Sequence, residues 1–370
     1  MQSIAMEHSA AKQNFVEIEQ IDHVEIYVAN IHQAAYFYSS ALGFTPVAFR
    51  GPESGLDDRV SVLLQQAGMR LVLTSSTGSH SAISEYIHLH GDSVRGVAFT
   101  VDDAEGAFRR AVACGAQAVQ LPATVQDGKG RMISSAIEAC GGLAHSFIER
   151  SNYDGEFLPG FQPIPQAKEN QAPRFTSLDH VAICLAKGTL DFWVKFYGEA
   201  FGFESHYQID ISTEYSGMKS KALRNKRGNV QCVLLEPAEG KRKSQIQEYL
   251  NFHHGPGVQH LAFLTDGLID TLRALQNRGI EFLSTPRPYY DQLEGRLGKL
   301  GDPLDVLREL NILVDCDETG QLMQVFTKPL HTRPTWFLEI IERRGARGFG
   351  GGNVKALFEA VEAEQALRAK

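Results

Sequence analysis

An internal repeat constrains this chain more than any other feature of its sequence. The stretch IDHVEIYVANIHQAAYFYSSALGFTPV, which begins at Ile21, returns as LDHVAICLAKGTLDFWVKFYGEAFGFESH from Leu178. Each copy has the pattern of an apolar strand, then an amphipathic helix, then a glycine that leads into another strand. We therefore expect the two halves of the chain to fold in the same way.

Two further segments repeat in the same order. VRGVAFTVDDAEGAFRRAVACGAQAV from Val94 matches VQHLAFLTDGLIDTLRALQNRGIEFL from Val258, and both have the pattern of a strand followed by a helix. LAHSFIERS, which begins at Leu143, matches WFLEIIERR, which begins at Trp336. Strands and helices that recur in one order predict an α+β fold made of two related domains.

The boundaries follow from composition. The segment SNYDGEFLPGFQPIPQAKENQAPRF between the copies is rich in Pro, Gln and Gly, which is typical of a linker. We predict an N-terminal domain over residues 18–154, a linker over 155–175 and a C-terminal domain over 176–345. Residues 346–370 begin with glycines and continue with an amphipathic pattern, which predicts a gate and a lid helix with Asn353 as its N-cap.

Composition argues against several classes of protein. A formal net charge of −8 and a pI near 5.9 provide no basic surface for nucleic acid. No apolar run reaches the roughly 18 residues of a membrane span, and the first residues lack the pattern of a signal peptide. We therefore expect a cytoplasmic protein that binds neither nucleic acid nor membrane. Its five scattered cysteines have no C-x-x-C spacing and are expected to be reduced packing residues.

Matching positions of the repeat differ in their polar residues. His180 in LDHVAI matches His23 in IDHVEI. His260, however, matches Gly96, and Glu339 matches Ser146. Glycine and serine cannot replace a ring and a carboxylate at packing positions without leaving a cavity. A lone histidine on an apolar strand is usually a core residue, but three polar residues that occur together in one half indicate a site.

A metal ion would satisfy these three residues together. Each lies among apolar neighbours in a strand-like segment, and a buried carboxylate must be paired or bound to a cation. Two imidazoles and one carboxylate are the ligands of the facial triad, which leaves open positions on Fe(II). Structural zinc sites prefer four closed ligands and often thiolates. The sequence favours Fe(II) over Zn(II), Mn(II) and Ni(II).

These residues carry a resemblance to a known family. From about residue 20 to its C-terminus, the chain resembles the 4-hydroxyphenylpyruvate dioxygenase and 4-hydroxymandelate synthase family, which is part of the vicinal-oxygen-chelate (glyoxalase-like) superfamily. The resemblance rests on segments in the family's order and spacing, namely LDHVAI, KRKSQIQEYL, GPGVQHLAF, STPRPYYDQL, LMQVFTKPLHTRPTWFLEIIERRG and GFGGGNVKALFEAV. It implies two vicinal-oxygen-chelate domains, each an open β-barrel of βαβββ repeats with outer helices, of which only the second binds a metal.

The resemblance also implies the chemistry and the site. The family's iron ligands match His180, His260 and Glu339, its substrate is an aryl-pyruvate, and O2 is the co-substrate. The aryl-pyruvate chelates two positions on the iron through its own 2-oxo acid, and O2 takes the third. We expect a homo-oligomer, either a dimer or a tetramer, as the assembly. The family's substrate-binding positions match Ser220, Leu235, Gln245, Gln259, Gln324, Phe326, Phe337, Phe349, Asn353 and Val354.

Two positions bear on the product. The homogentisate-forming dioxygenases have an asparagine where this chain has Leu235, and a phenylalanine where it has Val354. Both changes resemble hydroxymandelate synthase, so 4-hydroxymandelate is the favoured product. KRKSQIQ and FTKPL resemble the dioxygenases more, which leaves homogentisate formation in tyrosine catabolism as the alternative. An extradiol dioxygenase and a metal-free binding module are the more remote alternatives.

Overall fold

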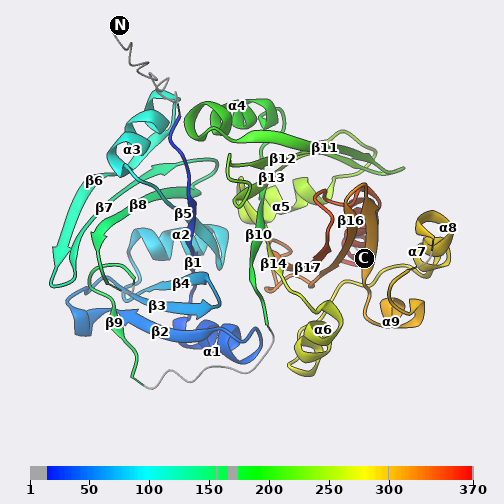
Figure 1. Cartoon of the computed structure of the whole chain (residues 1–370), viewed down its shortest axis with the longest axis horizontal. Helices are drawn as coiled ribbons and strands as arrows, with labels where there is room; N and C mark the ends of the chain where they lie inside the picture. The colour runs from blue at the N-terminus through cyan, green and yellow to red at the C-terminus, as the bar shows by residue number, and fades with distance from the viewer. Residues whose placement is uncertain (1–14, 156, 166–173, 299, 369–370) are drawn as a thin grey trace, which may run out of the picture.

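The computed structural model describes residues 15–155, 157–165, 174–298 and 300–368. Two curled sheets lie side by side, the first built by the N-terminal half and the second by the C-terminal half (Figure 1). Strands β1 (Gln20–Tyr27) and β10 (Ser177–Cys184) run near the junction of the two sheets. The predicted α+β fold of two related domains is confirmed.

The first sheet has the strand order β6-β7-β8-β5-β1-β4-β3-β2-β9. Its other strands are β2 (Thr45–Arg50), β3 (Arg59–Gln66), β4 (Met69–Ser76), β5 (Ser93–Thr100), β6 (Gln117–Asp127), β7 (Gly130–Glu138), β8 (Ala144–Tyr153) and β9 (Gln162–Pro163). Its helices are α1 (Ile31–Ser40), the 3-10 turn η1 (Pro52–Ser54), α2 (Ala82–His90) and α3 (Ala104–Ala113). β9 lies inside the predicted linker, of which residues 166–173 are outside the described residues, and the domain boundaries stay a prediction.

The second sheet has the strand order β11-β12-β13-β10-β14-β17-β16-β15. Its other strands are β11 (Glu204–Ser212), β12 (Gly217–Arg224), β13 (Gln231–Ala238), β14 (Gly257–Leu264), β15 (Leu313–Asp317), β16 (Gly320–Phe326) and β17 (Phe337–Arg344). The helices are α4 (Leu190–Phe201), α5 (Gln245–His253), α6 (Leu268–Asn277), α7 (Arg287–Asp291), α8 (Leu293–Leu297), α9 (Leu304–Glu309) and α10 (Gly351–Arg368).

The two sheets share one connectivity. When β10 is placed on β1 and β14 on β5, every later strand of the second sheet matches a strand of the first in the same order. The second half adds the short helices α7, α8 and α9 between α6 and β15, and the helix α10 after β17. The sequence repeat is therefore a structural repeat, and the additions lie in the half that carries the candidate metal ligands.

The repeated glycine after the first helix of each half has a conformational role. Gly43 and Gly202 both have positive φ angles, of 80° and 66°, which glycine adopts without a steric penalty. In each copy the residue after the glycine donates its backbone N–H back into the helix, from Phe44 to Tyr38 and from Phe203 to Tyr197. The turn thus ends the helix and buries a phenylalanine in the core.

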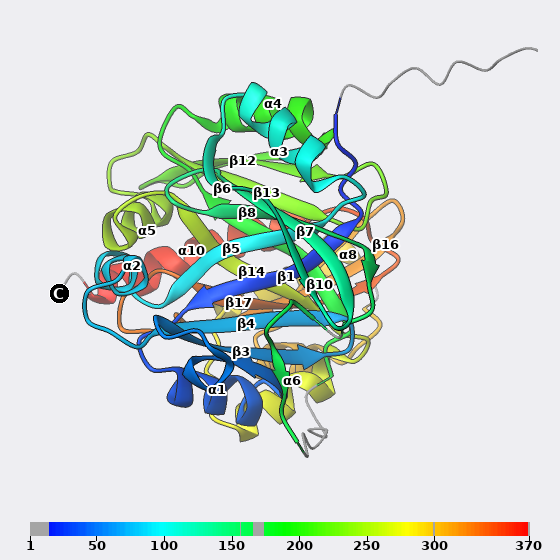
Figure 2. The same ribbon diagram turned by 90° about the vertical axis from the view of Figure 1, so that its left-hand side faces the viewer.

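The two halves pack through buried side chains from both. The Oη of Tyr197 on α4 lies 2.7 Å from Nε2 of His145 on β8, and both side chains are fully buried. Phe44 contacts Phe263 of the other half, with ring centroids 5.7 Å apart. Seen from the side of the N-terminal half, strands of the first sheet lie in front of strands of the second (Figure 2). The two halves therefore share one core.

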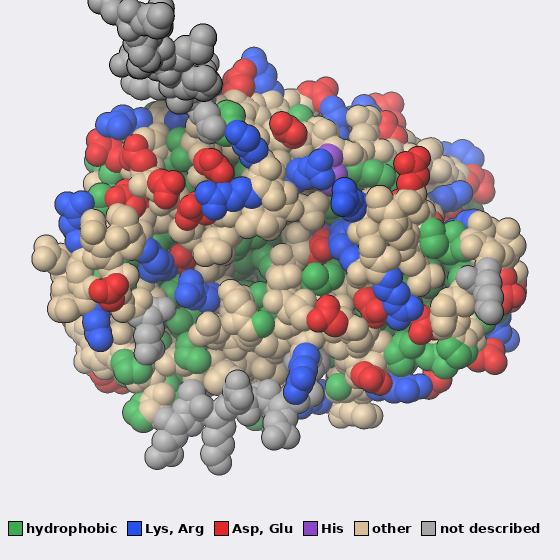
Figure 3. Space-filling view, viewed as in Figure 1, with side chains coloured by type: hydrophobic (Ala, Val, Ile, Leu, Met, Phe, Trp, Pro, Cys, Tyr) green, Lys and Arg blue, Asp and Glu red, His purple; other side chains and the backbone are tan. Residues whose placement is uncertain are grey.

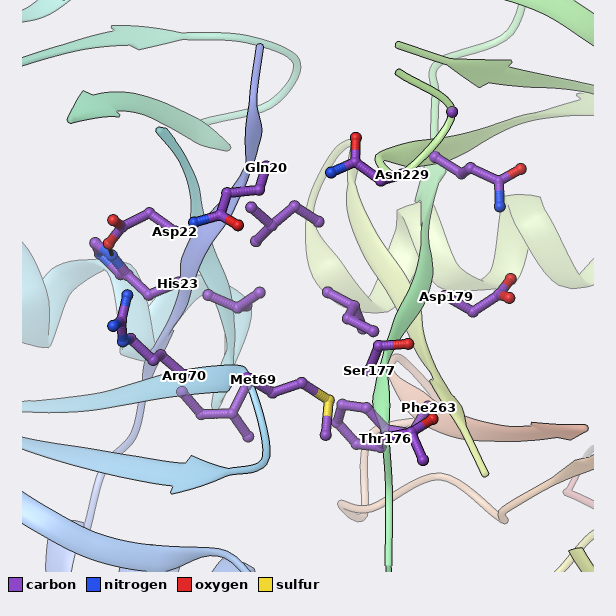
Figure 4. A pocket seen from close by; sticks show the side chains of 17 residues that line it. Gln20, Asp22, His23, Met69, Arg70, Thr176, Ser177, Asp179, Asn229 and Phe263 are labelled. Carbon is purple, nitrogen blue, oxygen red and sulfur yellow. Dashed lines mark hydrogen bonds and ion pairs between the residues drawn. The ribbon is translucent and has the colours of Figure 1, made fainter. Parts of the chain in front are cut away.

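A cleft of about 370 Å³ remains between β1 and β10. Asp22 and His23 lie on one side of it and Asp179 on the other, while Arg70 and Asn229 extend its two walls (Figure 4). The space-filling view shows a hollow near the middle of the same face, with acidic and basic side chains interspersed around it (Figure 3). The surface in this view carries no single-sign patch.

Other expectations concern the membrane and the cysteines. No helix in the described part of the chain is both long enough and apolar enough to cross a membrane.

All five cysteines are free, and Cys140, Cys184 and Cys232 are buried as expected of packing residues. Cys316 is exposed near the end of β15, so the prediction that every cysteine packs in the core is wrong for this residue.

Candidate metal centre and active site

Three neighbouring strands bring the candidate ligands to one face of the second sheet. Ala262 on β14 pairs with His180 on β10 at one side and with Glu339 on β17 at the other. Residues directly opposite each other in a sheet point to the same face, and so does a residue two positions along the strand. His260 is two residues before Ala262, so all three side chains converge.

The convergence is tight. Nε2 of His180 lies 3.2 Å from Oε2 of Glu339, and Nε2 of His260 lies 3.4 Å from the same oxygen. One ligand atom from each of the three residues falls within 4.8 Å of the others. In the described part of the chain, no other group of three His, Cys, Asp or Glu side chains comes together in this way. Two imidazole nitrogens and a carboxylate oxygen suit a first-row divalent metal.

The three side chains are buried, so a negative charge on Glu339 is unfavourable unless a positive charge balances it. Burial opposes ionisation of Glu339, but the two histidines hold the pKa of its carboxyl well below the ordinary value. Burial also disfavours a charged His180, yet Glu339 and Asp179 raise the pKa of that imidazole to about 9. Burial dominates at His260 and lowers its pKa. The carboxylate therefore needs a positive partner, which is either a proton on His180 or a metal ion.

Each candidate ligand is held by an outer partner. Nδ1 of His180 donates to Asp179 at 2.8 Å, and Nδ1 of His260 donates to Oε1 of Gln259 at 3.2 Å. These bonds leave both Nε2 atoms facing Glu339. Gln324 donates from Nε2 to Oε1 of Glu339 at 2.7 Å. Such partners fix the ring orientation and the tautomer of metal-binding histidines.

Asp179 is fixed in turn by an arginine. Nε and Nη2 of Arg343 donate to its two carboxylate oxygens at 2.6 and 2.8 Å. Burial opposes ionisation of Asp179, but the hydrogen bonds from Arg343 and His180 lower its pKa to about 2. Arg343 also donates to the backbone oxygen of Gly348 and lies over the ring of Phe349. One arginine thus connects Asp179 with the segment that precedes α10.

The first half keeps this arrangement without two of the donors. Gly96 pairs with Glu25 on β1 as His260 pairs with Ala182 on β10, and Ser146 pairs with Ala98 as Glu339 pairs with Ala262. These registers confirm the matches made from the sequence. Nδ1 of His23 lies 2.7 Å from Asp22, and Arg150 holds Asp22 through both oxygens. The aspartate that holds the histidine, and the arginine that holds this aspartate, are therefore present in both halves, whereas all three donors are present in one.

A pocket adjoins the three donors. Its lining comprises the cluster itself, eight of the residues expected to bind substrate (Ser220, Leu235, Gln245, Gln259, Gln324, Phe326, Phe349 and Val354), and also Tyr207, Ile209, Met218, Ala222, Val233 and Leu357. The last six were not predicted. Five of them lie on β11, β12 and β13, where strand alternation alone does not say which face turns inward. The pocket is mainly apolar, with polar groups near the donors.

Two predicted residues lie just behind the pocket. Phe337 stacks on the His260 ring, with centroids 5.0 Å apart and planes 23° apart, and it lines a small neighbouring cavity. Asn353 is fully buried and donates from Nδ2 to Oε1 of Gln324 at 2.9 Å. Its Oδ1 accepts a hydrogen bond from Tyr289 at 2.8 Å. Both residues therefore support groups that line the pocket.

The prediction that Asn353 caps the last helix is wrong. The helix α10 begins at Gly351, two residues earlier, and Asn353 lies in its first turn. Gly350, with φ of 64°, turns the chain into the helix, and its backbone oxygen accepts from Val354 N at 2.9 Å. The Asn353 side chain does not cap the helix because Gln324 and Tyr289 hold it inward.

The glutamines of the pocket differ in their hydrogen bonding. Gln259 and Gln324 are both engaged with the donor cluster. Gln245 is the first residue of α5 and is buried, and its Oε1 has no hydrogen-bond partner in the described part of the chain. A buried acceptor without a donor costs free energy, so this oxygen is suited to receive a hydrogen bond from a ligand.

Comparisons with known proteins agree with this geometry. The profile of the Glyoxalase/Bleomycin resistance protein/Dioxygenase superfamily matches residues 20–142 and again residues 177–305. The chain is 41% identical to a 4-hydroxyphenylpyruvate dioxygenase from Yarrowia lipolytica, over 94% of this chain and 92% of that one. A 4-hydroxyphenylpyruvate dioxygenase from Dictyostelium discoideum is 36% identical, over 95% and 99% of the two chains.

A solved structure shares the fold over nearly the whole chain. It is that of a triple mutant of 4-hydroxymandelate synthase from Streptomyces coelicolor, with a TM-score of 0.86 and 38% identity over 94% of this chain and 99% of that one. The superfamily profile matches once in each half, and the relatives match almost from end to end. The chain therefore belongs to the Glyoxalase/Bleomycin resistance protein/Dioxygenase superfamily and, within it, to the family of dioxygenases that includes 4-hydroxyphenylpyruvate dioxygenase and 4-hydroxymandelate synthase.

Proposed function

We propose that this dioxygenase is Fe(II)-dependent, oxidatively decarboxylates 4-hydroxyphenylpyruvate and hydroxylates the arylacetate that results. The observation that carries the proposal is the convergence of His180, His260 and Glu339 beside a mainly apolar pocket. These three residues would hold the iron on one side and leave its other side facing the pocket. When bound, Fe(II) supplies the redox chemistry by which one oxygen atom of O2 enters the new carboxylate and the other the new hydroxyl, with release of CO2.

The residues around the pocket would position the substrate. The unpartnered Oε1 of Gln245 is suited to accept a hydrogen bond from a hydroxyl group of the substrate. Phe326 and Phe349 would contact the aromatic ring, and Phe349 lies edge-on to His180 with ring centroids 5.1 Å apart. Ser220 faces the pocket beside Leu235, its partner across β12 and β13.

The gate must move for the substrate to bind. The pocket has a volume of about 50 Å³, which is room for one or two waters and too little for an aromatic ring with its side chain. Val354 and Leu357 of α10 line it, together with Phe349 before the helix. We infer that this segment shifts outward to admit the substrate and then closes over it, which excludes water during the reaction.

The favoured product is 4-hydroxymandelate. Leu235 is buried against the same apolar cluster that Val354 packs on, so both form one aliphatic wall of the pocket. A valine in place of an aromatic side chain leaves the substrate ring freer to tilt, and a leucine in place of an amide removes a polar tether. Both changes favour attack at the benzylic carbon. Homogentisate is the second candidate, because the curated relatives quoted above bear the name 4-hydroxyphenylpyruvate dioxygenase.

One experiment tests reaction class and product together. The purified protein is incubated with 4-hydroxyphenylpyruvate, Fe(II) and air, and O2 uptake, CO2 release and the products are measured. We expect one O2 consumed and one CO2 released per product, with mainly 4-hydroxymandelate on chromatography. Absence of turnover would refute the reaction class, whereas homogentisate alone would refute only the choice of product.

We also propose a homo-oligomer, dimer or tetramer, that acts in the cytoplasm. Size-exclusion chromatography with light scattering tests the assembly.

A further inference from the structure

The N-terminal half contains a cavity at the place that corresponds to the candidate active site. It has a volume of about 250 Å³ and opens on the face of the first sheet that carries His23 and Ser146. These two residues occupy the positions of His180 and Glu339 in the repeat. The cavity is therefore the counterpart of the catalytic pocket, and it is the larger of the two.

The cavity is open because two donor positions have small side chains. Gly96 and Ser146 stand where the other half has an imidazole and a longer carboxylate. His23 itself is fixed, since Asp22 binds its Nδ1 and Phe157 contacts the ring edge-on at a centroid distance of 5.1 Å. No set of three metal-binding side chains comes together in this half within the described residues. The cavity is therefore suited to an organic ligand rather than to a metal ion.

The charged groups that line the cavity differ in their pairing. Arg59 pairs with Asp58 at 2.8 Å, and Glu25 accepts a hydrogen bond from Thr74 at 2.7 Å. Arg50, at the end of β2, has no ion pair within 4 Å among the described residues, and its buried Nε has no hydrogen-bond partner there. A buried charged donor without an acceptor is costly, and a guanidinium binds a carboxylate through two parallel hydrogen bonds.

The position of Arg50 is also constrained. A Cβ atom on Gly160 would lie 3.0 Å from its Nε, so the guanidinium rests directly against the backbone at this glycine. Gly160 has φ of 87°, a conformation that glycine adopts readily. The guanidinium thus packs against the chain at Gly160, beside the cavity that Arg50 lines.

The rest of the lining is mixed. Val72, Met132, Ile148, Leu158 and Phe161 supply an apolar surface, and Ser61 is among the hydroxyl groups between them. This combination matches a ligand with one negative end and an apolar body. We propose that the N-terminal barrel binds a small organic monocarboxylate with a ring-sized apolar body, whose carboxylate is held by Arg50. The proposal does not depend on the iron chemistry of the other half.

The methionines allow the site to be located directly. The sequence has six, of which Met132 lines this cavity, Met218 lines the pocket beside the candidate metal ligands, and Met69 lines the cleft between the halves. The full-length protein is loaded with diamagnetic Zn(II), labelled with ¹³C at the methionine methyls and titrated with phenylacetate. This probe has no 2-oxo group with which to chelate the metal. We expect a saturable shift of the Met132 methyl.

Variants separate the proposal from its alternatives. Arg50→Gln is expected to weaken the Met132 response at least tenfold, and Ser146→Leu, which fills the cavity but keeps the arginine, is expected to abolish it. Arg109→Gln on the exposed face of α3 is the matched control and should respond as the wild type does. Unchanged Met69 and Met323 methyl positions establish that a variant is folded. The proposal is overturned if Met218 alone responds, if no methyl responds, or if the folded Arg50→Gln protein responds like the wild type.

Discussion

Gln324 holds the Glu339 carboxylate from the side opposite the two histidines, with its Nε2 2.7 Å from Oε1 of Glu339. The other end of the same amide accepts a hydrogen bond from Asn353, which belongs to the helix α10. The Tyr289 hydroxyl donates its one proton to Oδ1 of Asn353 and accepts a hydrogen bond from the backbone N–H of Val314. A chain of hydrogen bonds thus connects the candidate metal ligand Glu339 to the helix α10 and to β15.

The first prediction concerns this chain. Asn353→Ala leaves the buried Oε1 of Gln324 without its donor, which should lower the free energy of unfolding by about 1–3 kcal/mol. A looser α10 should also raise the ratio of O2 consumed to product formed, because the lid no longer excludes water. Thermal unfolding and an oxygen electrode coupled to chromatography measure the two effects. Lys355→Ala, at an exposed position of the same helix, is the control, and equal coupling in both variants would contradict the lid assignment.

The second prediction concerns the donors. His260→Ala and Glu339→Gln should each lose bound iron and turnover, because a facial triad has no spare ligand and an amide is a poorer donor than a carboxylate. His23→Ala changes the matching residue of the other half and should retain iron. Iron is quantified by atomic emission after gel filtration. Loss of iron from the His23 variant, with retention in the His260 variant, would contradict the assignment.

The third prediction separates positioning from packing. Asp179→Asn should weaken iron binding about 10–100-fold, because the residue orients His180, while Asp22→Asn should leave iron affinity unchanged. Both variants weaken a buried ion pair with an arginine, so both should be destabilised to a similar degree. Competition with a chelator gives the affinity, and denaturant unfolding gives the stability. Equal iron affinity in the two variants would show that Asp179 serves packing alone.

The fourth prediction concerns the product. The double variant Leu235→Asn with Val354→Phe restores an amide and an aromatic ring to the wall that the two residues share. We expect its product to shift from 4-hydroxymandelate toward homogentisate, since a tenfold change in the ratio requires only about 1.4 kcal/mol in relative barrier. Chromatography of both products, with each single variant as a control, measures the shift. An unchanged ratio in the folded double variant would contradict the role of this wall.

The fifth prediction concerns pH and the junction of the two halves. Burial lowers the pKa of His145 to about 4, so this imidazole is neutral in the folded protein and accepts from Tyr197. The unfolded chain takes up the proton near pH 6.5, so stability should be full above that pH and fall as the pH drops toward 4, by roughly 3 kcal/mol from this residue.

His145→Gln removes the titrating group but keeps a donor and an acceptor. The loss of stability between pH 6.5 and 4 should therefore be smaller in this variant than in the wild type, as measured by denaturant unfolding at each pH. His80→Gln, at an exposed position, should behave as the wild type does. Parallel pH profiles for the wild type and the His145 variant would contradict the assignment.

Much of the site could be predicted because matching positions of the two repeated halves can be compared with each other. Matching His260 to Gly96 and Glu339 to Ser146 needed only the order of residues, and strand pairing preserves that order. The side on which a residue lies relative to the pocket could not be predicted in this way. Phe337 is on a ligand-bearing strand yet packs behind His260, and Tyr207 faces the pocket although it was not predicted to do so.

Tertiary contacts explain the other differences. The sequence pattern suits Asn353 as a helix cap, but the amide of Gln324 and the hydroxyl of Tyr289 hold its side chain inward. Neither partner is near it in sequence, so no local rule predicts the contact. The short helices α7 to α9 have no counterpart in the first half, and the repeat therefore could not predict them.

The order of the three donors along the chain has a consequence for metal binding during synthesis on the ribosome. His180 emerges first, then His260, and Glu339 last, on a strand that must fit between β14 and β16. A nascent chain that has not reached β17 has the two candidate imidazole ligands but not the carboxylate of Glu339, so it would bind a metal ion more weakly. Under the proposed function, an oxygen-reactive metal would therefore be bound only after most of the second sheet has been made.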